Sequence, residues 1–133
     1  MVYYSEYRPD NGFDRDKIRA ALESILGSFS ERKRMLILPP DITRAHSGAG
    51  MITELLWKKL GERITDILPA LGTHTPMETA ELSRMFGRTP QTLFREHRWR
   101  TDIEELGRVP ASFVSSVTGG RLNFDYPVQV NRL

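Results

Sequence analysis

The stretch from Leu36 to Gly50, LILPPDITRAHSGAG, constrains the fold more than any other part of the sequence. It begins with a short apolar run that is typical of a buried parallel strand, and Pro39-Pro40 then breaks that run. A polar segment with Asp41 and Arg44 follows, and a glycine-containing segment leads into an amphipathic helix expected over residues 50–60. In an open α/β sheet, ligands bind at the carboxyl ends of the strands. The sequence therefore predicts a binding site in the loop after this strand.

The neighbouring segments complete a β-α-β unit. Apolar residues at helical spacing predict a helix between the cap Asp14 and Gly27, and the apolar residues 64–71 predict a second buried strand. Parallel strands place both following loops at one edge of the sheet, so we expect Asp41 and Arg44 to lie near His74.

The next helix has a well-marked expected start. Thr75-Pro76-Met77-Glu78 combines a threonine cap, proline at the first helical position and glutamate three residues after the cap. These signals predict a helix from Pro76 to Gly87 that begins just after His74. Further along, weaker patterns indicate a third strand at Leu93-Phe94, a fourth at residues 106–109, a helix over residues 110–117 and an extended segment over residues 123–133.

Together these elements predict an α/β fold, with a mainly parallel, Rossmann-like sheet and flanking helices. A chain of 133 residues fits one domain and buries roughly two-thirds of its unfolded surface, which is enough for a core. We expect residues 1–13 to be loosely ordered. Because Val128 and Val130 still alternate like a strand near the last residue, we expect the chain to be the amino-terminal part of a longer protein.

Composition excludes several classes of function. Nineteen basic and 17 acidic residues give a net charge of only +2, which predicts no binding to nucleic acid. The absence of cysteine excludes disulfides, thiolate metal sites and a cysteine nucleophile. No apolar run approaches the roughly 20 residues of a membrane span, and the first residues lack a signal-peptide pattern, so we expect a cytoplasmic protein without membrane contact.

Four residues near the expected sheet edge can carry chemistry. The planar fork of Arg44 matches a carboxylate, although an ion pair with Asp41 is an equally good interpretation. His74 titrates near neutrality and is a candidate general base, or else an ordinary loop residue. Asp41 can orient Arg44 or a histidine, or cap the following segment. Thr43 can donate to the same anion or bond to the local backbone.

The other histidines give weaker signals. His46 follows Arg44 closely and is better explained by a hydrogen bond within the loop, and a direct role for His97 is doubtful. The three histidines have no paired spacing such as His-x-x-x-His, so the sequence predicts no metal site within this chain.

Two motifs, Pro40-Asp41-Ile42-Thr43-Arg44 and Leu71-Gly72-Thr73-His74, resemble the first part of the nickel-pincer lactate racemase family. The similarity runs from about Asn11 to the last residue. Ala45 follows Arg44 where better-known members carry proline, which bears on the substrate more than on the fold.

The resemblance implies an enzyme that racemises or epimerises a 2-hydroxy acid by hydride transfer through a nickel-pincer nucleotide. It implies that His74, Arg44 and Asp41 are catalytic, that Arg44 and Thr43 bind substrate, and that Thr43 and Gly72 contact the cofactor. The remainder of the longer polypeptide is expected to hold most of the cofactor. Two alternatives stay open: a non-catalytic anion-binding or nucleotide-binding α/β module, and an isolated inactive folding domain.

Overall fold

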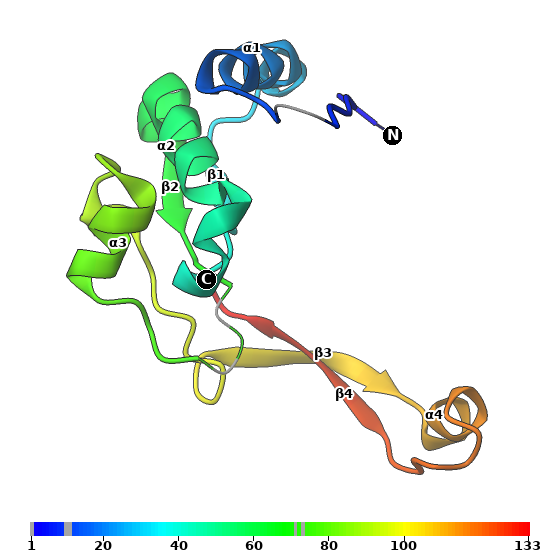
Figure 1. Ribbon diagram of the computed structural model, residues 1–133. Helices are drawn as coiled ribbons and strands as arrows, with labels where there is room; N and C mark the ends of the chain where they lie inside the picture. Colours follow the sequence, from blue (N-terminus) through cyan, green and yellow to red (C-terminus); the bar gives the residue numbers. More distant parts are fainter. Residues whose placement is uncertain (1, 10–11, 71, 73) are drawn as a thin grey trace. The chain divides into compact units, whose positions relative to one another are not determined.

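The computed structural model describes residues 2–9, 12–70, 72 and 74–133 (Figure 1). Its contacts divide the chain into two compact units, Met1–Glu96 and His97–Leu133. The described residues 2–9 form neither helix nor strand. Within the described ranges, every helix is too short or too polar to cross a lipid bilayer.

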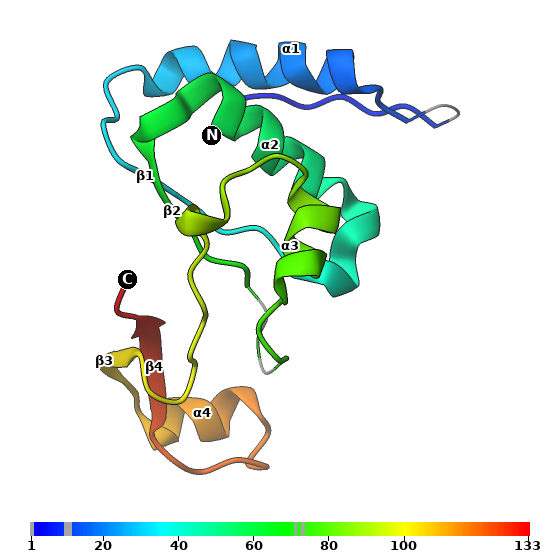
Figure 2. The same ribbon diagram turned by 90° about the vertical axis from the view of Figure 1, so that its left-hand side faces the viewer.

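The first unit begins with α1, Arg15–Leu26, as the apolar spacing predicts. Asp14 caps this helix by accepting a hydrogen bond of 2.7 Å from the Lys17 backbone N–H, and Gly27 follows its last turn. Figure 2 shows α1 lying alongside α2, Ala49–Leu60. This helix packs mainly on α2, and its Leu26 contacts the buried core.

The strands of this unit, β1 (Met35–Ile37) and β2 (Ile64–Ile67), pair in parallel, which confirms the predicted β-α-β connection through α2. β2 is shorter than the expected 64–71, because Pro39 on the opposite segment has no N–H to donate to the ladder. Pairing resumes once at Ala70, whose N–H donates to the Pro39 carbonyl at 2.7 Å.

In the described part of the chain, helices cover one side of the parallel pair. Leu60, Ile64 and Ile67 form the buried core of this unit. Leu36 and Leu38 are 44% and 62% exposed, so the expectation of a strand buried on both faces is wrong for β1 within this chain. A single layer of helices covers the inner face and leaves the other face of β1 open.

The helix after His74 begins later than predicted. α3 runs over Thr79–Phe86 rather than from Pro76, and the Glu78 backbone N–H donates to the Glu81 carboxylate at 3.0 Å. Its end at Gly87 is confirmed. The predicted strand at Leu93-Phe94 is reduced to one parallel bridge between Phe94 and Ile67, because a 3₁₀ helix, Gln91–Leu93, precedes it.

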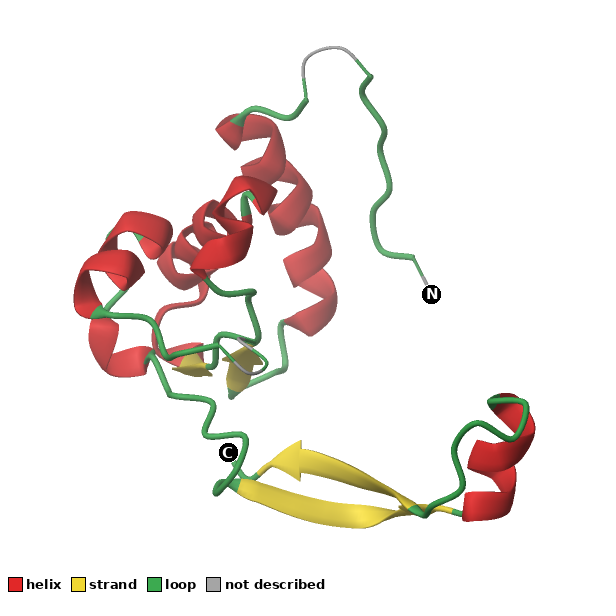
Figure 3. Cartoon of the chain, turned by 60° about the horizontal axis from the view of Figure 1, so that its bottom comes forward, coloured by secondary structure: helices red, strands yellow, loops and turns green. Residues whose placement is uncertain are grey.

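The second unit is a strand pair with a helix in its connection (Figure 3). β3 (Ile103–Val109) and β4 (Tyr126–Asn131) pair antiparallel, and α4, Ala111–Val117, lies between them in sequence. The predicted helix and extended segment are confirmed, whereas the strand expected over 106–109 begins earlier. The described residues thus form a mixed α/β chain with one parallel and one antiparallel strand pair.

Candidate functional site

The site segment follows β1 directly. After Pro40 the chain enters a 3₁₀ helix, Ile42–Ser47, which is kinked at Arg44 (φ −111°, ψ 24°), where the sequence predicted a loop. Asp41 begins this helix as its cap: its Oδ1 accepts from the Thr43 backbone N–H at 3.1 Å and from the Thr43 hydroxyl at 2.5 Å. These bonds fix the Asp41 carboxylate at the carboxyl end of β1.

The second oxygen of Asp41 holds His74. Its Oδ2 lies 2.6 Å from the His74 Nδ1, across 33 residues of sequence. The Asp41 side chain is only 5% exposed, whereas that of His74 is 57% exposed. The carboxylate is therefore the buried support of the pair, and the imidazole ring is the part that solvent or a ligand can reach.

The hydrogen bonds determine the charge of Asp41. Burial raises the pKa of this carboxyl, but the hydrogen bonds from Thr43 and His74 outweigh it and leave the pKa below its ordinary value. An ionised carboxylate can only accept hydrogen bonds, so the neutral His74 ring must carry its proton on Nδ1. The lone pair on Nε2 is then free to take a proton from a ligand.

The prediction that a helix begins just after His74 needs correction. Because α3 begins at Thr79, His74 does not directly precede a helix, and the positive end of a helix does not orient its ring. Asp41 supplies the orientation of the ring instead. From the sequence, Asp41 was expected to orient either Arg44 or a histidine, or to cap the following segment.

Arg44 lies on the same 3₁₀ helix as Thr43, with an exposed side chain. The alternative of an ion pair with Asp41 is not what the structure has, since both Asp41 oxygens bond to Thr43 and His74. Among the described residues, the Arg44 guanidinium has no carboxylate within ion-pair distance. A planar fork without such a partner is suited to an anionic ligand.

The remaining predicted residues divide into two groups. Gly72 lies in a turn with φ of 59°, a backbone conformation that favours glycine, and Leu71 and Thr73 of the same motif lie outside the described residues. His46 is exposed on the 3₁₀ helix. His97 belongs to the second unit, where its Nδ1 lies 3.2 Å from the Asn131 amide nitrogen.

The described part of the chain offers neither a group of metal ligands nor a lysine near His74 that could attach a cofactor. No three histidine, aspartate or glutamate side chains there are grouped so that they could hold a metal ion. Lys17, Lys58 and Lys59 pair with carboxylates on or beside α1 and α2, and Lys33 precedes β1 at its amino end. The residues present do not fit a metal-containing nucleotide by themselves.

The fold has a structural relative. No protein-family model matches the chain, and no curated protein does. A crystal structure of a Thermotoga maritima protein, a target of the Northeast Structural Genomics Consortium, is similar to it with a TM-score of 0.75 and 26% sequence identity. The similarity covers 95% of this chain and 32% of that chain, so the chain spans about a third of the length of the protein it matches.

Proposed function

We propose that this chain is the amino-terminal part of a lactate racemase-like enzyme that racemises or epimerises a 2-hydroxy acid. The hydrogen bond of 2.6 Å between Asp41 and His74 is the observation that carries this proposal. It joins the two motifs of the resemblance, Pro40 to Arg44 and Leu71 to His74, at the carboxyl ends of two parallel strands. In the larger protein we expect these strands to belong to a mainly parallel, Rossmann-like sheet.

Each residue has a distinct role in this proposal. The Arg44 guanidinium binds the substrate carboxylate with two parallel hydrogen bonds. The His74 Nε2 removes the proton from the substrate hydroxyl, while Asp41 keeps the ring in the required tautomer and stabilises the imidazolium that forms. Thr43 donates its hydroxyl proton to Asp41 and so acts as a positioning residue, and the substrate contact that the resemblance implies for it stays a prediction.

In the proposed reaction the substrate gives up a hydride, and a cofactor must accept it because no side chain can. The nickel-pincer nucleotide implied by the resemblance does not fit the described residues alone, since these offer neither a set of metal ligands nor a lysine beside His74. We therefore propose that its binding residues, apart from contacts at Gly72, lie outside these 133 residues. The isolated chain is expected to bind a hydroxy acid without racemising it.

The proposal is tested by titrating the chain with L-lactate, D-lactate and malate while recording amide NMR shifts. We expect saturable shifts around residues 41–48 and 74, weakened at least about tenfold in Arg44→Ala, because the guanidinium carries the carboxylate contact. Arg32→Ala removes an equal charge from an exposed turn and serves as the matched control.

Two results would count against the proposal. Equal carboxylate binding by the wild type and Arg44→Ala would remove the assigned substrate contact. Binding of a nucleoside monophosphate that is stronger than that of lactate and indifferent to His74→Ala would favour the alternative of a non-catalytic nucleotide-binding module.

A further inference from the structure

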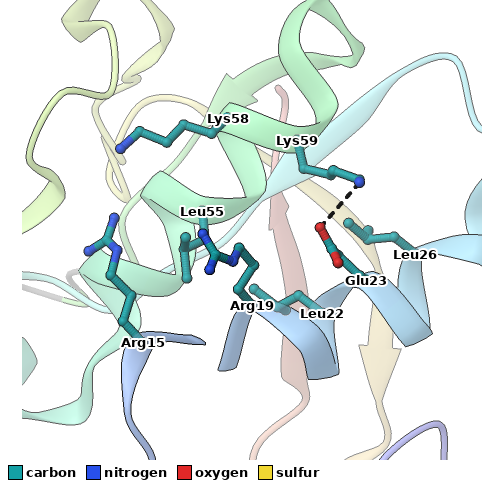
Figure 4. A pocket seen from close by; sticks show the side chains of 8 residues that line it. All are labelled: Arg15, Arg19, Leu22, Glu23, Leu26, Leu55, Lys58 and Lys59. Atoms are coloured by element: carbon teal, nitrogen blue, oxygen red, sulfur yellow. Dashed lines mark hydrogen bonds and ion pairs between the residues drawn. The ribbon is translucent and has the colours of Figure 1, made fainter. Parts of the chain in front are cut away.

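A hollow lies between α1 and α2, away from the Asp41 and His74 pair, and is called the basic groove below (Figure 4). Its volume is about 270 Å³, and four basic side chains line it: Arg15 and Arg19 from α1, with Lys58 and Lys59 from α2. The two lysines lie in the last turn of α2, whereas the 3₁₀ helix with Asp41 precedes its first turn. A helix of 12 residues is about 18 Å long, so the basic groove and the Asp41 site are separate.

The cations of this groove outnumber the carboxylates that pair with them. Arg15 and Lys58 share the one carboxylate of Glu54, at 2.5 Å and 2.9 Å. Glu54 is 10% exposed, so this shared pair is part of the packing between α1 and α2. Two cations on one buried carboxylate leave a surplus of positive charge at this end of the groove.

The other two cations are held weakly. Arg19 pairs with Asp16, whose side chain is 81% exposed, and Lys59 lies 3.3 Å from Glu23, whose side chain is 50% exposed. Exposed ion pairs of this kind contribute roughly 0–1 kcal/mol, so the anionic head of a ligand can replace the side-chain carboxylate in them. Arg19 and Lys59 are therefore available to a ligand without loss of the fold.

Besides the four cations, the lining consists of the Glu23 carboxylate and three leucines. Leu22 and Leu26 from α1 and Leu55 from α2 line the groove between the charged groups, as Figure 4 shows. Among the described residues no aromatic side chain lines it, so they offer no ring on which a nucleobase could stack. Ligand pockets for drug-sized molecules begin at about 300 Å³, so this groove suits a smaller ligand.

We propose that the basic groove binds a short aliphatic anion, a carboxylate or a phosphate monoester, with its head on Arg19 and Lys59 and its chain on the three leucines. The head exchanges with the carboxylates of Asp16 and Glu23, and the leucines gain contact with the chain in place of water. This site is independent of the proposed racemase function.

The test uses the full 133-residue chain and four probes: hexanoate, hexyl phosphate, hexanol and inorganic phosphate. We expect saturable amide NMR shifts in α1 and the last turn of α2 with hexanoate or hexyl phosphate, and at least about tenfold weaker binding of the uncharged alcohol and of the ion without a chain. Whether hexanoate or hexyl phosphate binds more tightly identifies the head group.

Three variants make the test decisive. Arg19→Gln with Lys59→Gln should weaken hexanoate binding at least about tenfold, and Arg32→Gln with Lys33→Gln, which removes equal charge from an exposed turn, should leave it unchanged. Glu23→Gln should strengthen binding because it removes the competing carboxylate. Equal binding by the first double variant, or saturable binding of hexanol as tight as that of hexanoate, would overturn the site. So would the absence of saturable shifts with both anionic probes.

Discussion

Asp41 and His74 are joined by a hydrogen bond of 2.6 Å between a buried carboxylate and an exposed imidazole. The pair spans two loops that follow neighbouring parallel strands. A buried carboxylate that accepts from Nδ1 fixes both the orientation and the tautomer of a histidine. The geometry therefore assigns the basic nitrogen of His74 as Nε2.

The tautomer of His74 can be measured by NMR, and we expect a substitution of Asp41 to invert it. In the wild type at about pH 8, above the ordinary histidine pKa, two-bond proton–nitrogen NMR correlations should show Nδ1 protonated. Asp41→Asn should move the proton to Nε2: the oxygen of the introduced amide must still face the Thr43 N–H, so its NH₂ group faces Nδ1 as a donor. His46, exposed on the same 3₁₀ helix, serves as the internal control. An identical His74 tautomer in both proteins would show that Asp41 does not set it.

The sequence was sufficient to predict that Asp41 lies near His74, because this proximity depends on connectivity, but it left the partner of Asp41 open. An apolar run, a helix and a second apolar run define a β-α-β unit, and such a unit brings Asp41 and His74 to one edge whatever the strand lengths. That Arg44 has no carboxylate partner among the described residues was not predictable, since this depends on which groups bond to each Asp41 oxygen. The basic groove was also missed, because Arg15 and Arg19 resemble the solvated face of an amphipathic helix.

Other elements could not be predicted because tertiary contacts override local signals. Pro76 and Met77 line the same hollow as Phe94 and lie outside α3, although the local signals predicted a helix from Pro76. In the second unit, β3 carries Glu104, Glu105 and Arg108 and has little buried surface. Because buried and exposed residues do not alternate along β3, the sequence holds almost no pattern from which its length or its antiparallel pairing could be predicted.

The true start of α3 leads to a prediction about stability. Glu81→Ala removes the acceptor for the Glu78 backbone N–H and should lower the free energy of unfolding by about 0.5–1 kcal/mol. Thr75→Ala should change it by less than about 0.5 kcal/mol, because Thr75 lies before the helix rather than at its cap. Urea unfolding of both variants measures the difference. A larger loss for Thr75→Ala would restore the helix start that the sequence predicted.

The ionisation of Glu54 makes the free energy of unfolding of the first unit depend on pH. Its hydrogen bonds from Arg15 and Lys58 lower its pKa from 4.5 to about 2. Since the folded pKa lies below the unfolded one, the stabilisation is fully present above pH 4.5 and is lost as pH falls towards about 2. Unfolding by urea over this range should show stability falling with pH.

The contribution of this one carboxylate can be isolated by substitution. Glu54→Gln should lower stability at neutral pH and reduce the slope between pH 4.5 and about 2. Glu62→Gln, at an exposed position after α2, is the matched control and should keep the wild-type slope. An unchanged slope in Glu54→Gln would assign the acid sensitivity to other carboxyls, such as those of Asp41 and Asp66, whose pKa values are also lowered.

The packing of α2 on α3 depends on the absence of a side chain at Gly50. A Cβ built there would lie 2.0 Å from the Met85 carbonyl oxygen, a distance that no real contact allows. Gly50→Ala should therefore force the two helices apart and lower the free energy of unfolding by about 1–3 kcal/mol or more. Gly27→Ala is the control: Gly27 has helical backbone angles and no atom within 4 Å of the added Cβ, so this change should be neutral or stabilising by up to about 1 kcal/mol. Chemical denaturation measures both.

The Gly50→Ala variant should also affect the site. Because Gly50 follows the 3₁₀ helix with Asp41, and α3 follows the His74 segment, Gly50→Ala should shift the His74 ring signals in NMR spectra. A stable Gly50→Ala protein with unchanged His74 signals would show that the close helix contact does not position the pair.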